Sequence, residues 1–260
     1  MTIINKEMLR YIASAGVENY LLSSCAKLCH VSYCTNKTPN IEGFVLIEQV
    51  QVGCSQAIIG RVGETLYITF RGSDEFRDFI TDVNFFKRSL NIWNVDCGKV
   101  HSGFYNYYEK LRDICFKYII EYKDIVMTGH SLGSSVTYLA LETKIRFPVK
   151  KVRCVTFGSP RLGNKKFVDV VDKKVAYNIR VRNSKDPIPS FPLISYTHCG
   201  KDIVFDENGR CIKRPGGVRR LCNVLKSCTI PIISRLKQSP FDFHYMEAYH
   251  YNIRNFTSTE

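Results

Sequence analysis

The stretch Asp124-Ile-Val-Met-Thr-Gly-His-Ser-Leu-Gly133 decides the fold of this 260-residue chain. Its first five residues form a compact apolar run typical of a buried strand, and apolar residues recur at helical spacing after Gly133. Between the two lies Gly129-x-Ser131-x-Gly133, the pattern of a tight turn that presents a nucleophilic serine. Glycine suits both flanks of Ser131 because a side chain there would collide with neighbouring backbone. A helix-entry turn capped by Ser131 would use the same residues, but the strand before it and the helix after it favour the nucleophile.

Strands and helices alternate on both sides of this stretch. The β-rich run Thr65–Phe70 ends at the turn Arg71–Ser73, and apolar residues at three-and-four spacing predict a helix over Phe104–Tyr122. Two more strands are predicted at Val152–Phe157 and Asn178–Arg182. This alternation indicates an α/β fold with a mostly parallel central sheet flanked by helices on both faces.

Length and composition limit the class of protein. The 45% hydrophobic and 23% charged residues are ordinary for a globular protein and exclude a disordered or fibrous chain. No apolar run approaches the roughly 18 residues that a membrane-spanning helix needs, which excludes a transmembrane protein. We expect a single domain over residues 1–260, because 260 residues can build one large core.

The N-terminal residues and the cysteines suggest a cellular location. Met1–Ser23 mixes charged and apolar residues and lacks the apolar centre of a secretory signal. The eleven cysteines are odd in number and scattered, which favours reduced, buried thiols. We therefore expect a cytoplasmic or otherwise reducing compartment. Cys25, Cys29 and Cys34 lie near His30, but their spacing lacks a paired C-x-x-C, so buried thiols are favoured over a metal site.

Four motifs together resemble a known family. Gly129–Gly133 is preceded by Thr69–Ser73 and Val100–Phe104 and followed by Thr156–Asn164. In this order the motifs are similar to those of the class 3 lipases, which include fungal triacylglycerol lipases and plant acylhydrolases. The resemblance covers roughly Gln56 to His250. It implies an α/β-hydrolase fold and hydrolysis of acyl esters by a serine, aspartate and histidine triad, without a metal or organic cofactor.

The acid of such a triad follows the nucleophile along the chain. Asp186 lies in Val181–Pro189, after an apolar strand, and this segment resembles the acid loop of the family. In that place Asp186 would hold the histidine in the right tautomer and stabilise its charged form. A turn aspartate before a proline is the alternative interpretation.

The base must be a histidine after Asp186, which leaves His198, His244 and His250. The run His244-Tyr-Met-Glu-Ala-Tyr249 is similar to the C-terminal H-x-(L/M)-E-x-Y segment of the family, whose first histidine is the base. His244 is therefore the expected base. Of the histidines before Asp186, His101 is expected to give structural support near the nucleophile.

Two further features are implied by the resemblance. Ser73 occupies the position of the oxyanion residue of the family, and the backbone N–H of Leu132 would be the second donor. Asp74–Phe86 carries aromatic and aliphatic residues in an amphipathic pattern and corresponds to the mobile lid helix. A turn serine and an ordinary surface helix are the alternatives. Ser134 and Ser135 depart from the family, where glycine or alanine is more usual.

Positive charge is concentrated in the basic insertion at about 208–239, which has eight Lys and Arg residues and no Asp or Glu. Its apolar and basic residues separate on opposite faces of a predicted helix, a pattern typical of peripheral contact with an anionic membrane surface. A solvated surface excursion explains the pattern equally well. No nucleic-acid partner is expected, because no reading motif accompanies the charge.

The predicted function is a serine hydrolase that cleaves carboxylic esters of lipids such as triacylglycerol, diacylglycerol or phospholipid through an acyl-enzyme. Two alternatives stay open. One is an esterase for small or carbohydrate-linked acyl groups, and the other is a catalytically silent protein of the same fold that only binds lipid.

Overall fold

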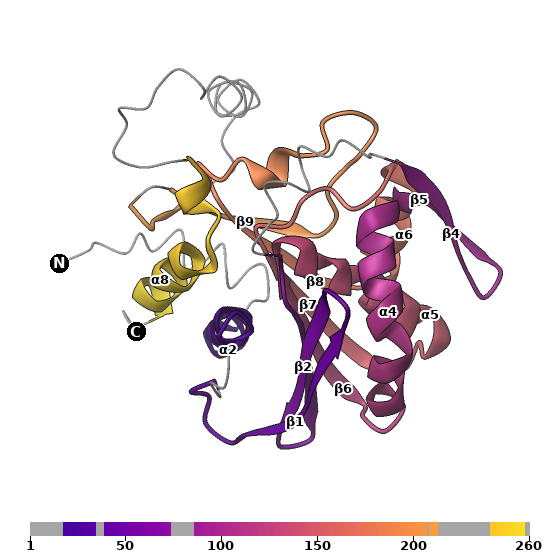
Figure 1. Ribbon diagram of the computed structural model, residues 1–260, viewed down its shortest axis with the longest axis horizontal. Helices are drawn as coiled ribbons and strands as arrows, with labels where there is room; N and C mark the ends of the chain where they lie inside the picture. The colour runs from indigo at the N-terminus through magenta and orange to yellow at the C-terminus, as the bar shows by residue number, and fades with distance from the viewer. Residues whose placement is uncertain (1–17, 35–38, 74–85, 207, 213–239, 258–260) are drawn as a thin grey trace.

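The computed structural model describes residues 18–34, 39–73, 86–206, 208–212 and 240–257 (Figure 1). The predicted lid over Asp74–Phe86 lies outside the described residues except for Phe86, and so does all of the basic insertion beyond residue 212. None of the described helices is long and apolar enough to cross a membrane.

The described chain is built around one eight-stranded sheet. The middle strands β3, β6, β7, β8 and β9 run parallel, while β1, β2 and β10 pair antiparallel at the two ends. This confirms the predicted mostly parallel sheet. In spatial order the strands are β1 (Phe44–Val52), β2 (Ser55–Val62), β3 (Thr65–Phe70), β6 (Asp124–His130), β7 (Lys151–Phe157), β8 (Tyr177–Asn183), β9 (Lys201–Phe205) and β10 (Cys211–Ile212).

Helices cover both faces of the sheet (Figure 1). One face carries α4 (Ser102–Ile119), α5 (Val136–Arg146) and α6 (Lys165–Lys174), and the other carries α2 (Asn19–Val31) and α8 (Met246–Thr257). Strand β6 contributes to both cores, because Ile125 and Met127 pack toward α4 and α5 while Val126 packs toward α2. Burial on both faces explains why this strand is an uninterrupted apolar run in the sequence.

Helix α4 is shorter than predicted. It ends at Ile119, whereas the apolar spacing predicted a helix as far as Tyr122. Ile120 is 59% exposed and lies in the turn that leads to β6. It is apolar but does not belong to the buried face of a helix. At the other end, the His101 side chain accepts a hydrogen bond from the Gly103 N–H and caps the helix.

Within the described ranges, the remaining elements are a hairpin and three short 3-10 helices. Strands β4 (Lys87–Ile92) and β5 (Val95–His101) pair with each other outside the main sheet, and β4 projects beside α4 (Figure 1). The 3-10 helices are η1 (Ser131–Ser135), η2 (Ile188–Ser190) and η4 (Pro240–Phe243).

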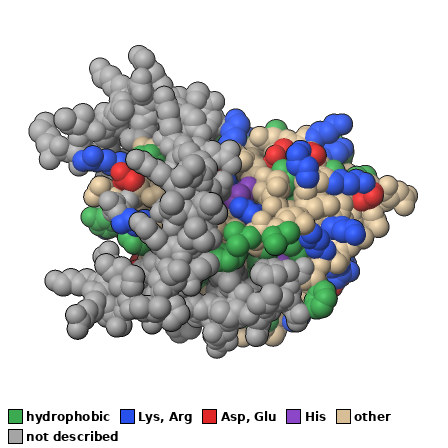
Figure 2. Space-filling view, turned by 90° about the horizontal axis from the view of Figure 1, so that it is seen from above, with side chains coloured by type: hydrophobic (Ala, Val, Ile, Leu, Met, Phe, Trp, Pro, Cys, Tyr) green, Lys and Arg blue, Asp and Glu red, His purple; other side chains and the backbone are tan. Residues whose placement is uncertain are grey.

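The carboxyl ends of the parallel strands meet along the upper edge of the sheet in the view of Figure 1. Phe70 at the end of β3 pairs with Gly129 in β6, and His130 pairs with Phe157 in β7. Seen from above, this end of the molecule shows a hydrophobic patch and many Lys and Arg side chains, with some Asp and Glu among them (Figure 2). The residues that follow β3, β6 and β8 are therefore brought together here.

Candidate active site

Ser131 stands on a strained turn between β6 and η1. Its φ angle is +55°, a left-handed conformation that is rare for residues other than glycine. The turn fits only because its neighbours lack side chains. A Cβ on Gly129 would lie 2.1 Å from the carbonyl oxygen of Gly133, and one on Gly133 would lie 2.2 Å from that of Phe70. The backbone of three segments thus holds the serine in place.

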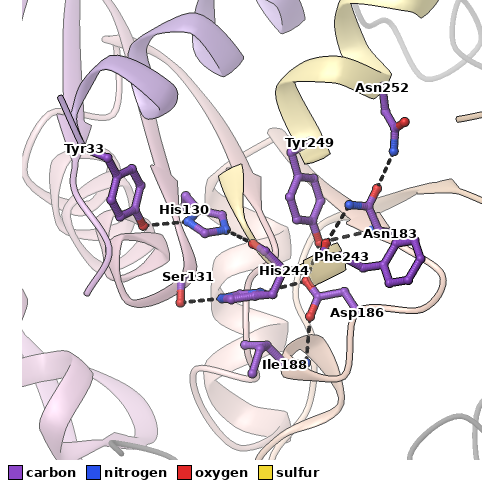
Figure 3. Close-up of polar contacts among 10 residues, drawn as sticks. All are labelled: Tyr33, His130, Ser131, Asn183, Asp186, Ile188, Phe243, His244, Tyr249 and Asn252. Carbon is purple, nitrogen blue, oxygen red and sulfur yellow. Dashed lines mark hydrogen bonds and ion pairs between the residues drawn. The ribbon is translucent and has the colours of Figure 1, made fainter. Parts of the chain in front are cut away.

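Ser131, His244 and Asp186 form one hydrogen-bonded row (Figure 3). The Ser131 hydroxyl lies 2.9 Å from His244 Nε2, and His244 Nδ1 lies 2.8 Å from Asp186 Oδ2. The three residues follow β6, η4 and β8, and all are at most 9% exposed. A serine that donates to an imidazole, which in turn donates to a carboxylate, can act as a nucleophile in acyl transfer.

The carboxylate of Asp186 accepts two hydrogen bonds besides the one from His244 (Figure 3). The Ile188 N–H donates to Oδ1 at 2.9 Å, and the Tyr249 hydroxyl donates to Oδ2 at 2.5 Å. Burial, together with the charge of Asp186, raises the pKa of Tyr249 well above its usual value, so the hydroxyl keeps its proton and stays a donor. Three donors fix the orientation of this carboxylate.

A network of amides anchors the chain just before His244. The Asn183 side chain donates to the carbonyl of Phe243 at 2.8 Å, and the Asn252 side chain donates to Asn183 at 2.9 Å. The Asn183 N–H donates to the Tyr249 hydroxyl. The end of β8 is therefore tied to both η4 and α8. Sequence reasoning assigned no role to Asn183 or Tyr249, although Tyr249 belongs to the motif that identified His244.

The two segments that carry the predicted oxyanion residues lie beside the serine. Leu132 follows Ser131 in η1. The turn that carries Ser73 packs directly against Ser131, since a Cβ on Gly72 would lie 3.2 Å from the Ser131 Cβ. Both predicted segments are therefore next to the nucleophile.

Other predicted candidates lie elsewhere. His250 stacks on His30 at 4.8 Å between ring centroids, at the contact of α8 with α2. Burial, with nearby His30, lowers the pKa of His250. His198 lies in the loop before β9. Cys29 is fully buried, its thiol contacts the Thr128 hydroxyl at 3.3 Å, and burial raises its pKa to about 12.

Comparison with known proteins gives relatives over about half of the chain. The chain is 32% identical to a lipase of Rhizopus niveus over 144 residues, which covers 51% of this chain and 36% of that protein. It is 31% identical to the secreted mono- and diacylglycerol lipase 1 of Fusarium solani over 158 residues, covering 54% and 44%. The chain thus spans less than half the length of these curated relatives.

The expectation of a cytoplasmic or otherwise reducing compartment is wrong in the light of these relatives, because the Fusarium solani protein is named as secreted. That expectation rested on the N-terminal residues and on the cysteine pattern. All nine cysteines in the described part are free, and seven of them are buried. Buried thiols are unreactive in an oxidising or a reducing compartment, so the pattern does not distinguish the two.

Solved structures support the fold. The crystal structure of Lip2 lipase from Yarrowia lipolytica matches with a TM-score of 0.64 at 19% identity and covers 93% of this chain and 94% of that one. At this identity the likeness concerns the fold alone. A family model described as Lipase (class 3) matches residues 67–196, which is half of the 260 residues. The chain therefore belongs to the class 3 lipase family, with its α/β-hydrolase fold.

Proposed function

We propose that this protein is a serine hydrolase that cleaves carboxylic esters of lipids. The row formed by Ser131, His244 and Asp186 carries this proposal. The Ser131 oxygen attacks the acyl carbonyl while its proton passes to His244 Nε2, which then donates it to the leaving alcohol. Water next attacks the acyl-enzyme and gives a proton to His244, and the return of that proton to Ser131 releases the fatty acid.

Asp186 supports this cycle without taking up a proton. Its carboxylate holds Nδ1–H of His244, which directs Nε2 toward Ser131, and it stabilises the imidazolium formed during attack. The donors from Ile188 and Tyr249 keep the carboxylate in that orientation.

When Ser131 attacks, the substrate carbonyl oxygen becomes negatively charged and needs hydrogen-bond donors that point at it. We assign this role to the backbone N–H of Leu132, at the start of η1, and to Ser73, whose turn packs against the nucleophile. Donors supplied by backbone need no reorganisation during the reaction, which is why they stabilise the transition state well.

The names of the relatives favour lipids as the substrate class. They are lipases, and the Fusarium solani protein is named for monoacylglycerol and diacylglycerol. We propose that residues 1–260 act as one domain and that the basic insertion at about 208–239 contacts anionic lipid surfaces. The chemistry described above needs no metal or organic cofactor.

The test is hydrolysis by purified protein of emulsified triacylglycerol, phospholipid vesicles and a soluble short-chain ester. Ser131→Ala should abolish turnover and labelling by a fluorophosphonate probe. Ser135→Ala, the same substitution four residues later in η1, should keep both. Activity on the soluble ester alone would favour the small-ester esterase. Lipid binding without any turnover would favour a silent protein, and labelling of Ser131→Ala would refute the nucleophile.

A further inference from the structure

His130 precedes the proposed nucleophile, and both nitrogens of its ring are hydrogen bonded (Figure 3). Nδ1 lies 2.6 Å from the Tyr33 hydroxyl, and Nε2 lies 2.7 Å from the backbone carbonyl oxygen of His244. A carbonyl only accepts, so Nε2 carries the proton and donates it. Nδ1 of the neutral ring then accepts, and the Tyr33 hydroxyl donates to it. His130 thus joins the chain after helix α2 to the backbone of His244.

Burial keeps the His130 ring neutral. His130 is only 4% exposed, and this burial holds its pKa well below the usual range. The nearby His244 lowers the pKa further. The rings of His130 and His244 are 4.7 Å apart between centroids. Neutrality matters at this distance, because His244 becomes positively charged when it takes the proton of Ser131, and a second charge would oppose that step.

The Tyr33 hydroxyl lies against Gly72, which has no side chain to displace it. The Tyr33 N–H donates to the carbonyl of His30 in α2, and the Arg71 guanidinium lies 5.3 Å from the centre of the Tyr33 ring. A Cβ on Gly72 would lie only 2.0 Å from the Tyr33 hydroxyl oxygen and 2.7 Å from the His130 carbonyl. Glycine at position 72 is therefore required for Tyr33 to reach His130 beside the nucleophile.

The backbone carbonyls of Phe243 and His244 accept hydrogen bonds from residues at the ends of two different strands. Asn183 at the end of β8 donates to Phe243, and His130 at the end of β6 donates to His244. The backbone of His244 is thus fixed on the side of Asp186 and on the side of Ser131. Only the second contact depends on α2, through Tyr33.

We propose that Tyr33 and His130 are positioning residues for the hydrolysis, and that together they hold His244 at the distance from Ser131 that proton transfer requires. The inference rests on the proposed function. It makes the segment just after α2, far from the triad in sequence, a positioning part of the site that does not contact the substrate.

Tyr33→Phe tests the bridge because it removes one hydroxyl and keeps the ring. The matched control is Tyr138→Phe, since Tyr138 is fully buried and its hydroxyl donates to the Leu162 carbonyl at 2.7 Å. Tyr33→Phe loses a part-buried hydrogen bond and Tyr138→Phe loses a fully buried one, so the control should be destabilised at least as much in thermal unfolding. On a soluble short-chain ester, only Tyr33→Phe should lower kcat, by about tenfold, with KM little changed.

Variants at His130 test whether the two residues act as one unit. His130→Leu removes both hydrogen bonds and should lose at least as much kcat as Tyr33→Phe. Adding Tyr33→Phe to His130→Leu should cost nothing more, because the bridge is already absent. His130→Gln offers an amide that can donate to the His244 carbonyl and accept from Tyr33, and it should recover most of the activity lost in His130→Leu.

Three results would overturn the inference: a kcat of Tyr33→Phe equal to that of Tyr138→Phe, losses that multiply in the double variant, or no recovery in His130→Gln. These outcomes are separate from failure of the proposed function. That failure would appear as hydrolysis by Ser131→Ala, or as no hydrolysis by the unmodified protein.

Discussion

Ser131 illustrates how a single residue is held in an unfavourable conformation. A φ of +55° costs a residue with a side chain about 1 kcal/mol or more. The backbones of Gly129 and Gly133, and of Gly133 and Phe70, pack closely against each other and fix the conformation of the turn. The position of the hydroxyl is therefore set by backbone packing, and the strain is balanced by the burial of the surrounding strands.

The assignment of the base leads to a prediction about histidines. His244→Ala should lower kcat by several orders of magnitude, because Ser131 then has no proton acceptor. His250→Ala should cost far less, since His250 stacks on His30 away from the row. His198→Ala serves as a second comparison. Equal losses in His244→Ala and His250→Ala on a soluble ester would leave the base unassigned.

His101 gives a prediction for stability against pH. Burial lowers its pKa to about 4, from 6.5 for the free side chain. Below pH 6.5 the unfolded chain therefore binds a proton that the folded chain resists. The stability that His101 contributes is complete above pH 6.5 and is lost as the pH falls toward 4, by about 2 to 3 kcal/mol at pH 4.5.

Urea unfolding of the wild type and of His101→Asn at pH 7.5 and pH 4.5 measures this loss. Asparagine keeps a side-chain acceptor for the Gly103 N–H and does not titrate. The wild type should lose more stability between the two pH values than the variant does. The same pH dependence in both proteins would contradict the assignment to His101.

At the scale of elements, the short helix η1 contains buried hydroxyls that lower the stability of the fold, and a substitution can remove them. Ser134 and Ser135 are fully buried, and neither hydroxyl has a hydrogen-bond partner among the residues that the structure describes. An unsatisfied buried hydroxyl costs about 1 to 3 kcal/mol. These are also the positions where the family more often has glycine or alanine.

Ser135→Ala should therefore raise the free energy of unfolding by about 1 kcal/mol and leave hydrolysis intact. Thermal and urea unfolding would measure the gain. Thr143→Ala is the matched control, because the Thr143 hydroxyl is equally buried but donates to the Leu139 carbonyl. That variant should be destabilised. A loss of stability in Ser135→Ala would show that its hydroxyl has a partner in solution.

Elements with strong apolar runs could be predicted from sequence, and others could not. Strand β3 has the predicted bounds Thr65–Phe70, since most of its residues are buried. Strand β1 lies at the edge of the sheet, where most residues are partly or fully exposed, so its pattern is weak. Motif order predicted the three residues that form the hydrogen-bonded row, Ser131, Asp186 and His244. Tyr33 and Asn183 were missed because their contacts join segments 97 and 60 residues apart.

At the scale of the whole molecule, the net charge of +13 favours binding to a negatively charged surface. The upper face in Figure 2 carries many Lys and Arg side chains with some Asp and Glu among them. Much of the remaining positive charge belongs to the basic insertion, most of which lies outside the described residues.

We expect binding to phosphatidylserine vesicles that falls steeply with added salt, because each cation near such a surface contributes about 1 kcal/mol. Charge reversal of Arg219, Arg220 and Lys226 should weaken this binding and leave hydrolysis of a soluble ester unchanged. Reversal of three exposed lysines on α4 and α6, Lys110, Lys117 and Lys174, is the control. Equal sedimentation with neutral and anionic vesicles would rule out this role for the insertion.

The distribution of the proposed triad along the chain affects how activity arises during folding. Positions 131, 186 and 244 follow different elements, and the contacts that hold His244 form when η4 and α8 dock on β8 and β6. Parallel pairing of distant strands is slow to form, since long loops must close first. Recovery of turnover after dilution from denaturant should therefore lag behind recovery of helical signal, which makes catalysis a reporter of the final assembly step.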